Sequence, residues 1–112
     1  MKLKVIIFFL VSFFCNFSYA ATDIGLGTLI AVKVYDLGTD KSIRVYFGND
    51  VTFENQSCLR VAKVTYNAHD KEFVDRFLSV AMAAYMSGKK VRITSNTNDC
   101  EASLIALQET RF

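Results

Sequence analysis

The sequence has no proline and a single histidine among its 112 residues. It contains no internal repeat and no low-complexity tract, so nothing in it marks a boundary between two domains. No G-x-S-x-G, H-E-x-x-H or glycine-rich phosphate loop occurs in it. His69 stands beside Asp70 ahead of an expected helix, and we interpret it as a solvated residue, with a catalytic-base or pH-sensing role as the alternative. These absences argue against an enzyme and against a bound cofactor or metal.

The first twenty residues have the pattern of a cleavable secretory signal peptide. Lys2 and Lys4 precede an apolar run over residues 5–14, and Ser18-Tyr19-Ala20 supplies small residues at the −3 and −1 positions of a cleavage site. A membrane anchor is the competing interpretation, but spanning a bilayer takes about twenty apolar residues and this run has about ten. Cleavage would leave residues 21–112 as a single domain, secreted or periplasmic, in a bacterium.

The charge balance changes when this leader is set aside. Of the 13 basic residues, Lys2 and Lys4 belong to it, which leaves 11 bases against 11 acids and a net charge of zero. A neutral exported domain lacks the basic footprint that nucleic-acid binding requires. We therefore expect neither nucleic acid as a partner nor insertion into a membrane.

Only two cysteines, Cys58 and Cys100, remain after residue 20, because Cys15 falls within the leader. In an oxidising compartment they have one intramolecular pairing. Closing that loop stabilises the fold by about 4 kcal/mol in the chain-entropy model, comparable with what a small core supplies. A metal pair or a redox pair is the alternative, but there is no C-x-x-C and only one distant histidine. We expect a structural disulfide.

Five segments have the alternation or the β-branched composition of strands. They are residues 28–35, 42–47, 59–66, 91–94 and 102–107. Gly25 and Gly27 are interpreted as the boundary before the first of them. The short Gly- and Asp-rich link between the first two segments predicts a hairpin. Residues 51–53 form either a further short strand or a bulge.

One helix is expected over residues 70–87, where apolar residues recur at the helical period. Its apolar face comprises Phe73, Phe77, Ala81 and Ala84, flanked by Val74, Leu78, Met82 and Tyr85. Asn67 is the expected N-cap, and Gly88 fits the left-handed position that ends a helix. The acidic pairs Asp70 with Glu72 and Asp99 with Glu101 are interpreted as groups that cap turns and helix ends.

The resulting order β-β-β-α-β-β predicts a small β-barrel with one helix, of the OB-fold type. An α+β fold, in which an open antiparallel sheet packs on one helix, has the same order and remains the alternative. OB barrels bind ligands on an open face and in their loops, so binding is expected rather than catalysis. The tyrosines Tyr35, Tyr46, Tyr66 and Tyr85 are candidates for a sugar-stacking surface, although such residues commonly bridge core and water.

The segment Ala84-Tyr85-Met86-Ser87-Gly88, which leads into Val91-Arg92-Ile93, resembles the B subunits of pertussis-like AB5 toxins, especially those of the subtilase cytotoxin type. In that family the corresponding helix also ends in a glycine shortly before a Val-Arg-Ile-type strand. The leader, the size, the cysteine pair and the strand order agree as well, although the cysteine positions differ somewhat from the family's.

The resemblance implies a ring of five subunits that binds cell-surface glycans and partners a toxin A subunit. In the family, a serine near the entry to strand one and an aromatic residue after the Val-Arg-Ile strand contact the sugar. The matching positions here are Thr28 for the serine, and Thr94 and Ser95 for the aromatic residue, so the flat aromatic face is missing. An exported inhibitor or immunity protein that binds a protein partner is the alternative function.

Overall fold

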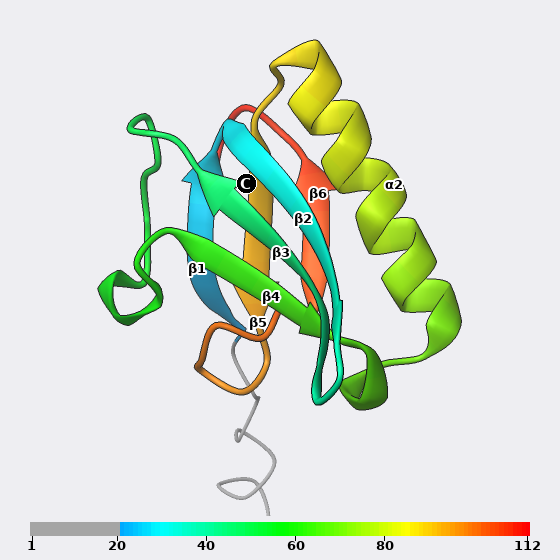
Figure 1. The fold of residues 1–112 in the computed structure, drawn as a ribbon. Helices are drawn as coiled ribbons and strands as arrows, with labels where there is room; N and C mark the ends of the chain where they lie inside the picture. The colour runs from blue at the N-terminus through cyan, green and yellow to red at the C-terminus, as the bar shows by residue number, and fades with distance from the viewer. Residues whose placement is uncertain (1–20) are drawn as a thin grey trace, which may run out of the picture.

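Two three-stranded antiparallel sheets and one long helix form the part of the chain that this computed structural model describes, residues 21–112 (Figure 1). The expected signal peptide, residues 1–20, lies outside the described residues. In chain order the elements are β1 (Thr22–Gly27), β2 (Leu29–Leu37), β3 (Asp40–Phe47), the 3-10 turn η1 (Gln56–Cys58), β4 (Val61–Thr65), the 3-10 turn η2 (Tyr66–Ala68), α2 (Lys71–Ser87), β5 (Val91–Ser95) and β6 (Leu104–Leu107). The sheets have the orders β1-β5-β6 and β2-β3-β4.

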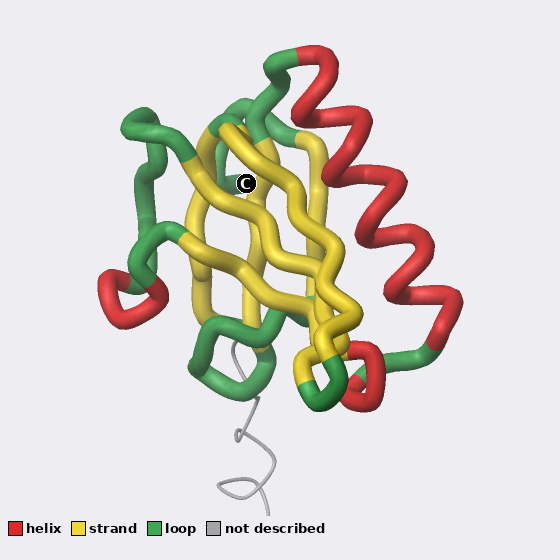
Figure 2. Tube along the Cα trace, in the orientation of Figure 1, coloured by secondary structure: helices red, strands yellow, loops and turns green. Residues whose placement is uncertain are grey.

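The two sheets are joined along two seams. Only Thr28 separates β1 from β2, so these strands act as one long strand that bends from the first sheet into the second. At the second seam, Lys63 of β4 forms a parallel bridge to Glu101, shortly before β6. The Lys63 backbone N–H donates to the Cys100 carbonyl at 2.9 Å, and the Ala102 N–H donates to the Lys63 carbonyl at 2.8 Å. The sheets therefore form a small, partly open barrel, and the prediction of a barrel with one helix is confirmed (Figure 2).

The core lies between the sheets and under the helix. Alternation along β3 buries Ile43, Val45 and Phe47 on one face. The helix contributes Phe77 to this core and packs against β2 and β6, one strand from each sheet. Burying such a large apolar side chain contributes about 1.5–3 kcal/mol. The apolar face of α2 is narrower than expected, because Met82 and Tyr85 are exposed.

The two ends of α2 differ in how well the sequence predicts them. Gly88 takes the left-handed conformation, with φ 70° and ψ 19°, and its N–H bonds to the Ala84 carbonyl, as expected. The prediction of Asn67 as N-cap is wrong, because Asn67 lies within η2. Asp70 occupies the N-cap position, but its side chain makes no capping hydrogen bond. The chain stays extended through His69, whose side chain contacts a neighbouring loop, and the helix begins only after it.

Strand β1 was not expected from the sequence, which places Gly25 and Gly27 in a boundary. These glycines are instead buried strand residues that pair with β5. A Cβ on Gly25 would lie 2.8 Å from Val51 Cγ2 and 2.9 Å from a ring carbon of Phe47. Gly25 therefore does not end the strand; it allows Val51 and Phe47 to pack closely against the strand backbone.

Three other boundaries shift for local reasons. β4 begins at Val61 and not at residue 59, because Leu59 and Arg60 take left-handed conformations with φ 54° and 64°. β6 begins at Leu104 because the residues before it pair with β4 at the second seam. Residues 51–53 contribute only an isolated bridge between Thr52 and Leu26.

Cys58 and Cys100 form the expected disulfide, with their Cα atoms 5.4 Å apart. It links η1 to the residue that precedes Glu101, so it holds the second seam in place. Among residues 21–112, no helix is both long enough and apolar enough to cross a bilayer.

Reducing the Cys58–Cys100 bridge is expected to lower the free energy of unfolding by a few kcal/mol, about 2–4, because the unfolded chain regains the entropy of an open loop. Denaturant unfolding with and without reductant measures this difference. A Cys58→Ser/Cys100→Ser variant should match the reduced protein. Identical midpoints under both conditions would show that the bridge does not stabilise the fold.

Candidate functional site

The outer face of the β2-β3-β4 sheet carries a group of basic and aromatic side chains that contact one another. OB-type barrels bind ligands on the face of their second and third strands and on the adjoining loops. With β1 and β2 counted as one bent strand, these are β3 and β4. We define the cation–tyrosine face as the outward side chains of Lys33, Tyr35, Arg44, Tyr46 and Lys63.

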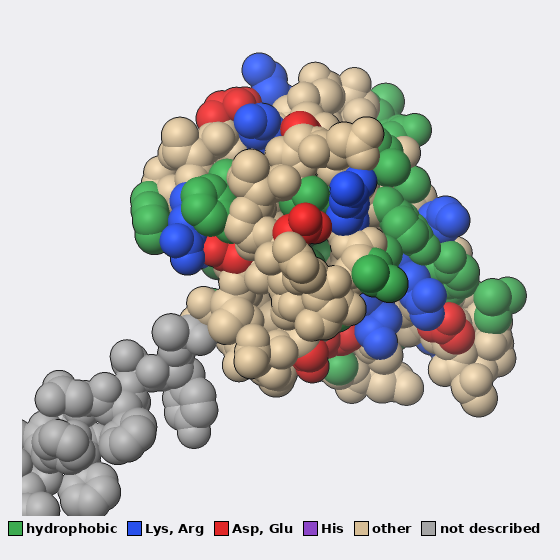
Figure 3. Space-filling view, turned by 90° about the vertical axis from the view of Figure 1, so that its left-hand side faces the viewer, with side chains coloured by type: hydrophobic (Ala, Val, Ile, Leu, Met, Phe, Trp, Pro, Cys, Tyr) green, Lys and Arg blue, Asp and Glu red, His purple; other side chains and the backbone are tan. Residues whose placement is uncertain are grey.

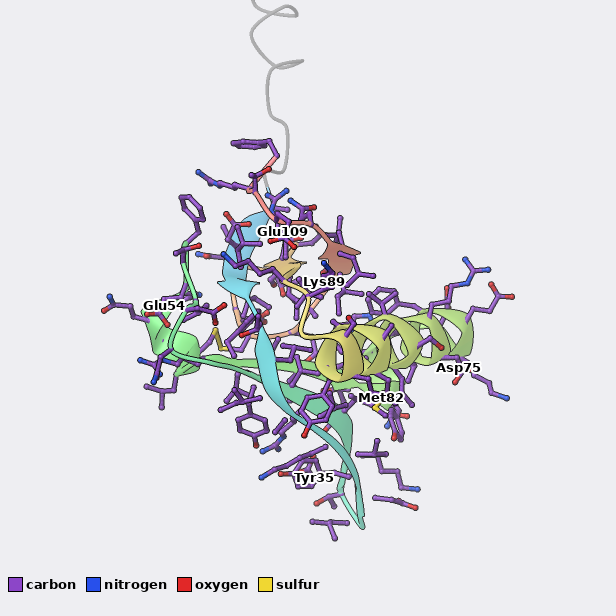
Figure 4. The ribbon with its side chains drawn as sticks, turned by 90° about the horizontal axis from the view of Figure 1, so that it is seen from above. Tyr35, Glu54, Asp75, Met82, Lys89 and Glu109 are labelled. Carbon is purple, nitrogen blue, oxygen red and sulfur yellow. A yellow bond between two sulfur atoms is a disulfide. The ribbon has the colours of Figure 1, made fainter. Side chains whose placement is uncertain are left out.

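Strand register brings these five side chains together. Lys33 lies directly opposite Arg44, and Arg44 lies directly opposite Lys63 on the next strand. Tyr35 and Tyr46 lie on either side of this row, and their hydroxyl oxygens are 3.5 Å apart. Figure 4 shows Tyr35 outside the β2–β3 hairpin, away from β1 and β5.

Each of two cations stacks on a tyrosine ring. Lys33 Nζ lies 4.8 Å from the centre of the Tyr46 ring, and Arg44 Cζ lies 4.7 Å from the centre of the Tyr35 ring. Such contacts stabilise by about 0.5–1 kcal/mol at exposed sites. The hydrogen bond to Tyr46, together with partial desolvation, raises the pKa of Tyr35 above its ordinary value.

Two carboxylates flank the row of cations. Arg44 Nη2 donates to Asp40 Oδ2 at 2.8 Å, and Lys63 Nζ lies 4.0 Å from Glu101 Oε2. Among the described residues Lys33 has no ion-pair partner, and the Nε of Arg44 is buried without a hydrogen-bond partner. The face therefore carries three positive charges against two negative ones.

Glu101 organises the second seam beside this face. Its carboxylate accepts hydrogen bonds from the backbone N–H of Thr65 at 2.6 Å and from the Thr65 hydroxyl at 3.1 Å. Nε2 of His69 lies 3.2 Å from the same carboxylate, and the His69 ring packs 4.8 Å from that of Phe73. The prediction of a solvated His69 is therefore wrong: its side chain is only 15% exposed.

An open cleft of about 660 Å³ lies beside His69 and Glu101, where the start of α2 meets the β5–β6 loop. It is lined by Asn67, Ala68, His69, Asp70, Phe73, Asn96, Thr97, Glu101 and Ser103. Most of these groups are polar, and Phe73 supplies an aromatic surface. The cleft is a second place at which a small polar ligand could be held.

The three ligand-binding residues predicted from the resemblance do not come together. Thr28 lies at the bend between β1 and β2, and its N–H and hydroxyl both donate to the carboxylate of Asp50. Thr94 and Ser95 lie at the other end of the β1–β5 ladder, and both are buried. Their role in ligand binding stays a prediction, and neither Thr94 nor Ser95 presents its hydroxyl on the surface.

Ser95 instead belongs to a network that shapes the β5–β6 loop. Its hydroxyl donates to Asp99 Oδ1 at 3.0 Å, and the Thr97 hydroxyl and the Glu101 N–H donate to the same oxygen. The bonds from Thr97 and Glu101 hold the pKa of Asp99 below its ordinary value of 3.8. The expectation that Asp99 caps a turn is met here.

The sequence did not reveal that Lys33, Arg44 and Lys63 form a row. Alternation places Arg44 and Tyr46 on the outer side of β3, but which residues oppose them depends on the register of three strands. Of the four tyrosines considered for sugar stacking, the structure brings Tyr35 and Tyr46 together. Tyr85 lies apart from them, on the exposed side of α2.

Within residues 21–112, no cluster of three or more His, Cys, Asp and Glu side chains is placed to hold a metal ion. On the side of the molecule that Figure 3 shows, basic and acidic side chains are interspersed. Comparison with protein-family models, with curated proteins and with solved structures finds no match to this chain.

Replacing Glu101 by Gln is expected to lower the free energy of unfolding by about 1–3 kcal/mol, because one acceptor oxygen becomes a donor and the contacts with Thr65 and His69 lose the negative charge that strengthens them. Chemical denaturation measures the change. Glu109→Gln is the matched control, since Glu109 is exposed and forms no ion pair among the described residues. An equal decrease in the free energy of unfolding in both variants would show that the contacts of Glu101 at the seam do not stabilise the fold.

Acid sensitivity should depend in part on Asp99. Its pKa is lowered in the folded state, so its contribution to stability is present above pH 3.8 and is lost as the pH falls through the folded-state value. Between about pH 5 and about pH 2, the melting temperature should therefore fall less steeply with decreasing pH for Asp99→Asn than for the parent protein. Asp75→Asn, an exposed helix position, is the control and should follow the parent curve.

Proposed function

We propose that this protein is an exported, non-enzymatic binding domain that recognises a cell-surface glycan on the cation–tyrosine face. The observation that carries the proposal is the pair Tyr35 and Tyr46, whose hydroxyl oxygens meet at 3.5 Å on the outer side of the β2-β3-β4 sheet. The same side contains β3 and β4, which correspond to the strands on which OB-type barrels bind ligands. Tyrosine combines an apolar ring, suited to the face of a sugar, with a hydroxyl that bonds to sugar hydroxyls.

Export is part of the proposal. The leader pattern over residues 1–20 supports it, and the Cys58–Cys100 bridge is a bond of oxidising compartments. The resemblance to toxin B subunits adds a ring of five subunits and a toxin A subunit as partner. In such a ring each subunit would offer one face, and weak single-site affinity would be raised by multivalency.

A second candidate function is that of a periplasmic interaction protein, such as an inhibitor or immunity protein. It is favoured by the segment between β3 and β4, which holds Phe53 and Leu59 on left-handed backbone with their side chains 52% and 81% exposed. Exposed apolar side chains on strained backbone are a feature that a protein-binding surface would use. Figure 1 shows this segment projecting from the barrel on the side away from α2.

Replacing Tyr46 by Ala should weaken glycan binding by about fivefold, since stacking on one aromatic ring contributes on the order of 1 kcal/mol. Tyr46→Phe should keep most of the affinity, because it retains the ring. Tyr85→Ala on the helix is the matched control and should bind as the parent does. A glycan array identifies the sugar, and titration calorimetry with that sugar measures the differences.

Two outcomes would contradict the proposal. Absence of binding across neutral and charged glycans would exclude a lectin function and favour the interaction protein. Equal loss in Tyr46→Ala and Tyr85→Ala would place the site elsewhere. Native mass measurement tests the ring separately, since a stable monomer would exclude a toxin-like pentamer while leaving the binding face intact.

A further inference from the structure

The cation–tyrosine face contains an arrangement that folding alone does not favour. Lys33, Arg44 and Lys63 occupy directly opposed positions on three neighbouring strands. Like charges at directly opposed cross-strand positions destabilise a sheet. A feature of this kind, on the face where the fold binds ligands, indicates a function other than stability.

The neighbouring acids offset only part of this repulsion. Asp40 pairs with Arg44 from the hairpin end, and Glu101 approaches Lys63 from the seam, so both carboxylates lie beside the row and not within it. Lys33 has no ion-pair partner among the described residues. The Nε of Arg44 is buried and donates to nothing in residues 21–112, which leaves one strong donor unsatisfied.

We propose that the row of Lys33, Arg44 and Lys63 binds an acidic polysaccharide, with successive sulfate or carboxylate groups lying across the three strands. This inference rests on the proposed glycan-binding function and names the class of glycan. Neighbouring strands are about 4.8 Å apart, so the row spans about 10 Å. A linear chain with repeated anionic groups matches three cations at this spacing.

The chemistry of each member of the row fits this ligand. An arginine guanidinium matches the oxygens of sulfate or carboxylate, and lysine supplies point charges on either side. Tyr35 and Tyr46 flank the row, so sugar rings between the anionic groups would meet aromatic side chains. The residues after the leader have zero net charge, and therefore the attraction is local to this face.

The test uses the mature chain, residues 21–112 with the disulfide intact, and three oligosaccharides of equal length. They are a heparin fragment that carries sulfates and carboxylates, a hyaluronan fragment that carries carboxylates only, and a neutral dextran fragment. Both anionic fragments should bind at least about tenfold more tightly than dextran. Raising the salt concentration should weaken the binding of both, because salt screens exposed ion pairs. Their relative affinities show which anionic group is preferred.

Lys33→Gln should weaken binding of the preferred anionic fragment about fivefold, and Lys33→Gln/Lys63→Gln should weaken it further. Lys89→Gln, at the exposed end of α2, is the charge-matched control and should not change the affinity. Lys33→Gln removes both the contact with the Tyr46 ring, which stabilises the fold, and the repulsion from Arg44, which destabilises it. These effects oppose each other, so the melting temperature should stay close to that of the parent, and that measurement separates lost binding from lost folding.

Dextran binding as tight as that of the anionic fragments, with Tyr46 required, would overturn this inference and leave the proposed function standing. Absence of binding to all three fragments and to an array of other glycans would overturn both. Affinity for a single-stranded oligothymidylate equal to or above that for heparin would assign the row to nucleic acid and not to polysaccharide. Equal effects of Lys33→Gln and Lys89→Gln would show that the charge of the row is not used.

Discussion

The barrel depends on one carboxylate, that of Glu101, which joins parts of the fold that lie far apart in the sequence. It accepts hydrogen bonds from the end of β4 at Thr65 and contacts His69 at the approach to α2, and the backbone of Glu101 lies at the parallel bridge to Lys63. Without this seam, β4 is an edge strand paired only with β3. Closing the barrel and setting the start of the helix are therefore consequences of the same contact.

The disulfide and the seam support each other. Cys100 immediately precedes Glu101 and accepts a hydrogen bond from Lys63, while its partner Cys58 lies in the turn before β4. The bridge restricts the unfolded chain, and the hydrogen bonds select the register in the folded one. That register also sets the outer face, because Lys63 faces Arg44 only when β4 is paired as observed. A structural seam and a candidate binding surface thus share residues.

Much of the fold could be predicted, because it follows from patterns between near neighbours in the chain. Alternation along residues 42–47 identified β3, the helical period identified α2, and Gly88 ended it in the expected conformation. Strand β1 was missed because Gly25 resembles a break, whereas packing against Val51 requires a residue without a side chain. The cap at Asn67 was misplaced because residues 66–68 form a separate 3-10 turn and His69 is extended, so the helix begins only after Asp70.

The sequence by itself determined what depends on local propensity and counting: the strands other than β1, the helix, the single pairing of the two cysteines after residue 20, and the neutral charge of residues 21–112. Only the tertiary structure decided that Tyr35 meets Tyr46, that three cations stand in a row, and that Glu101 meets His69. Those contacts depend on strand register and on closure of the barrel. Both are set by packing of the whole core, so no short stretch of sequence encodes them.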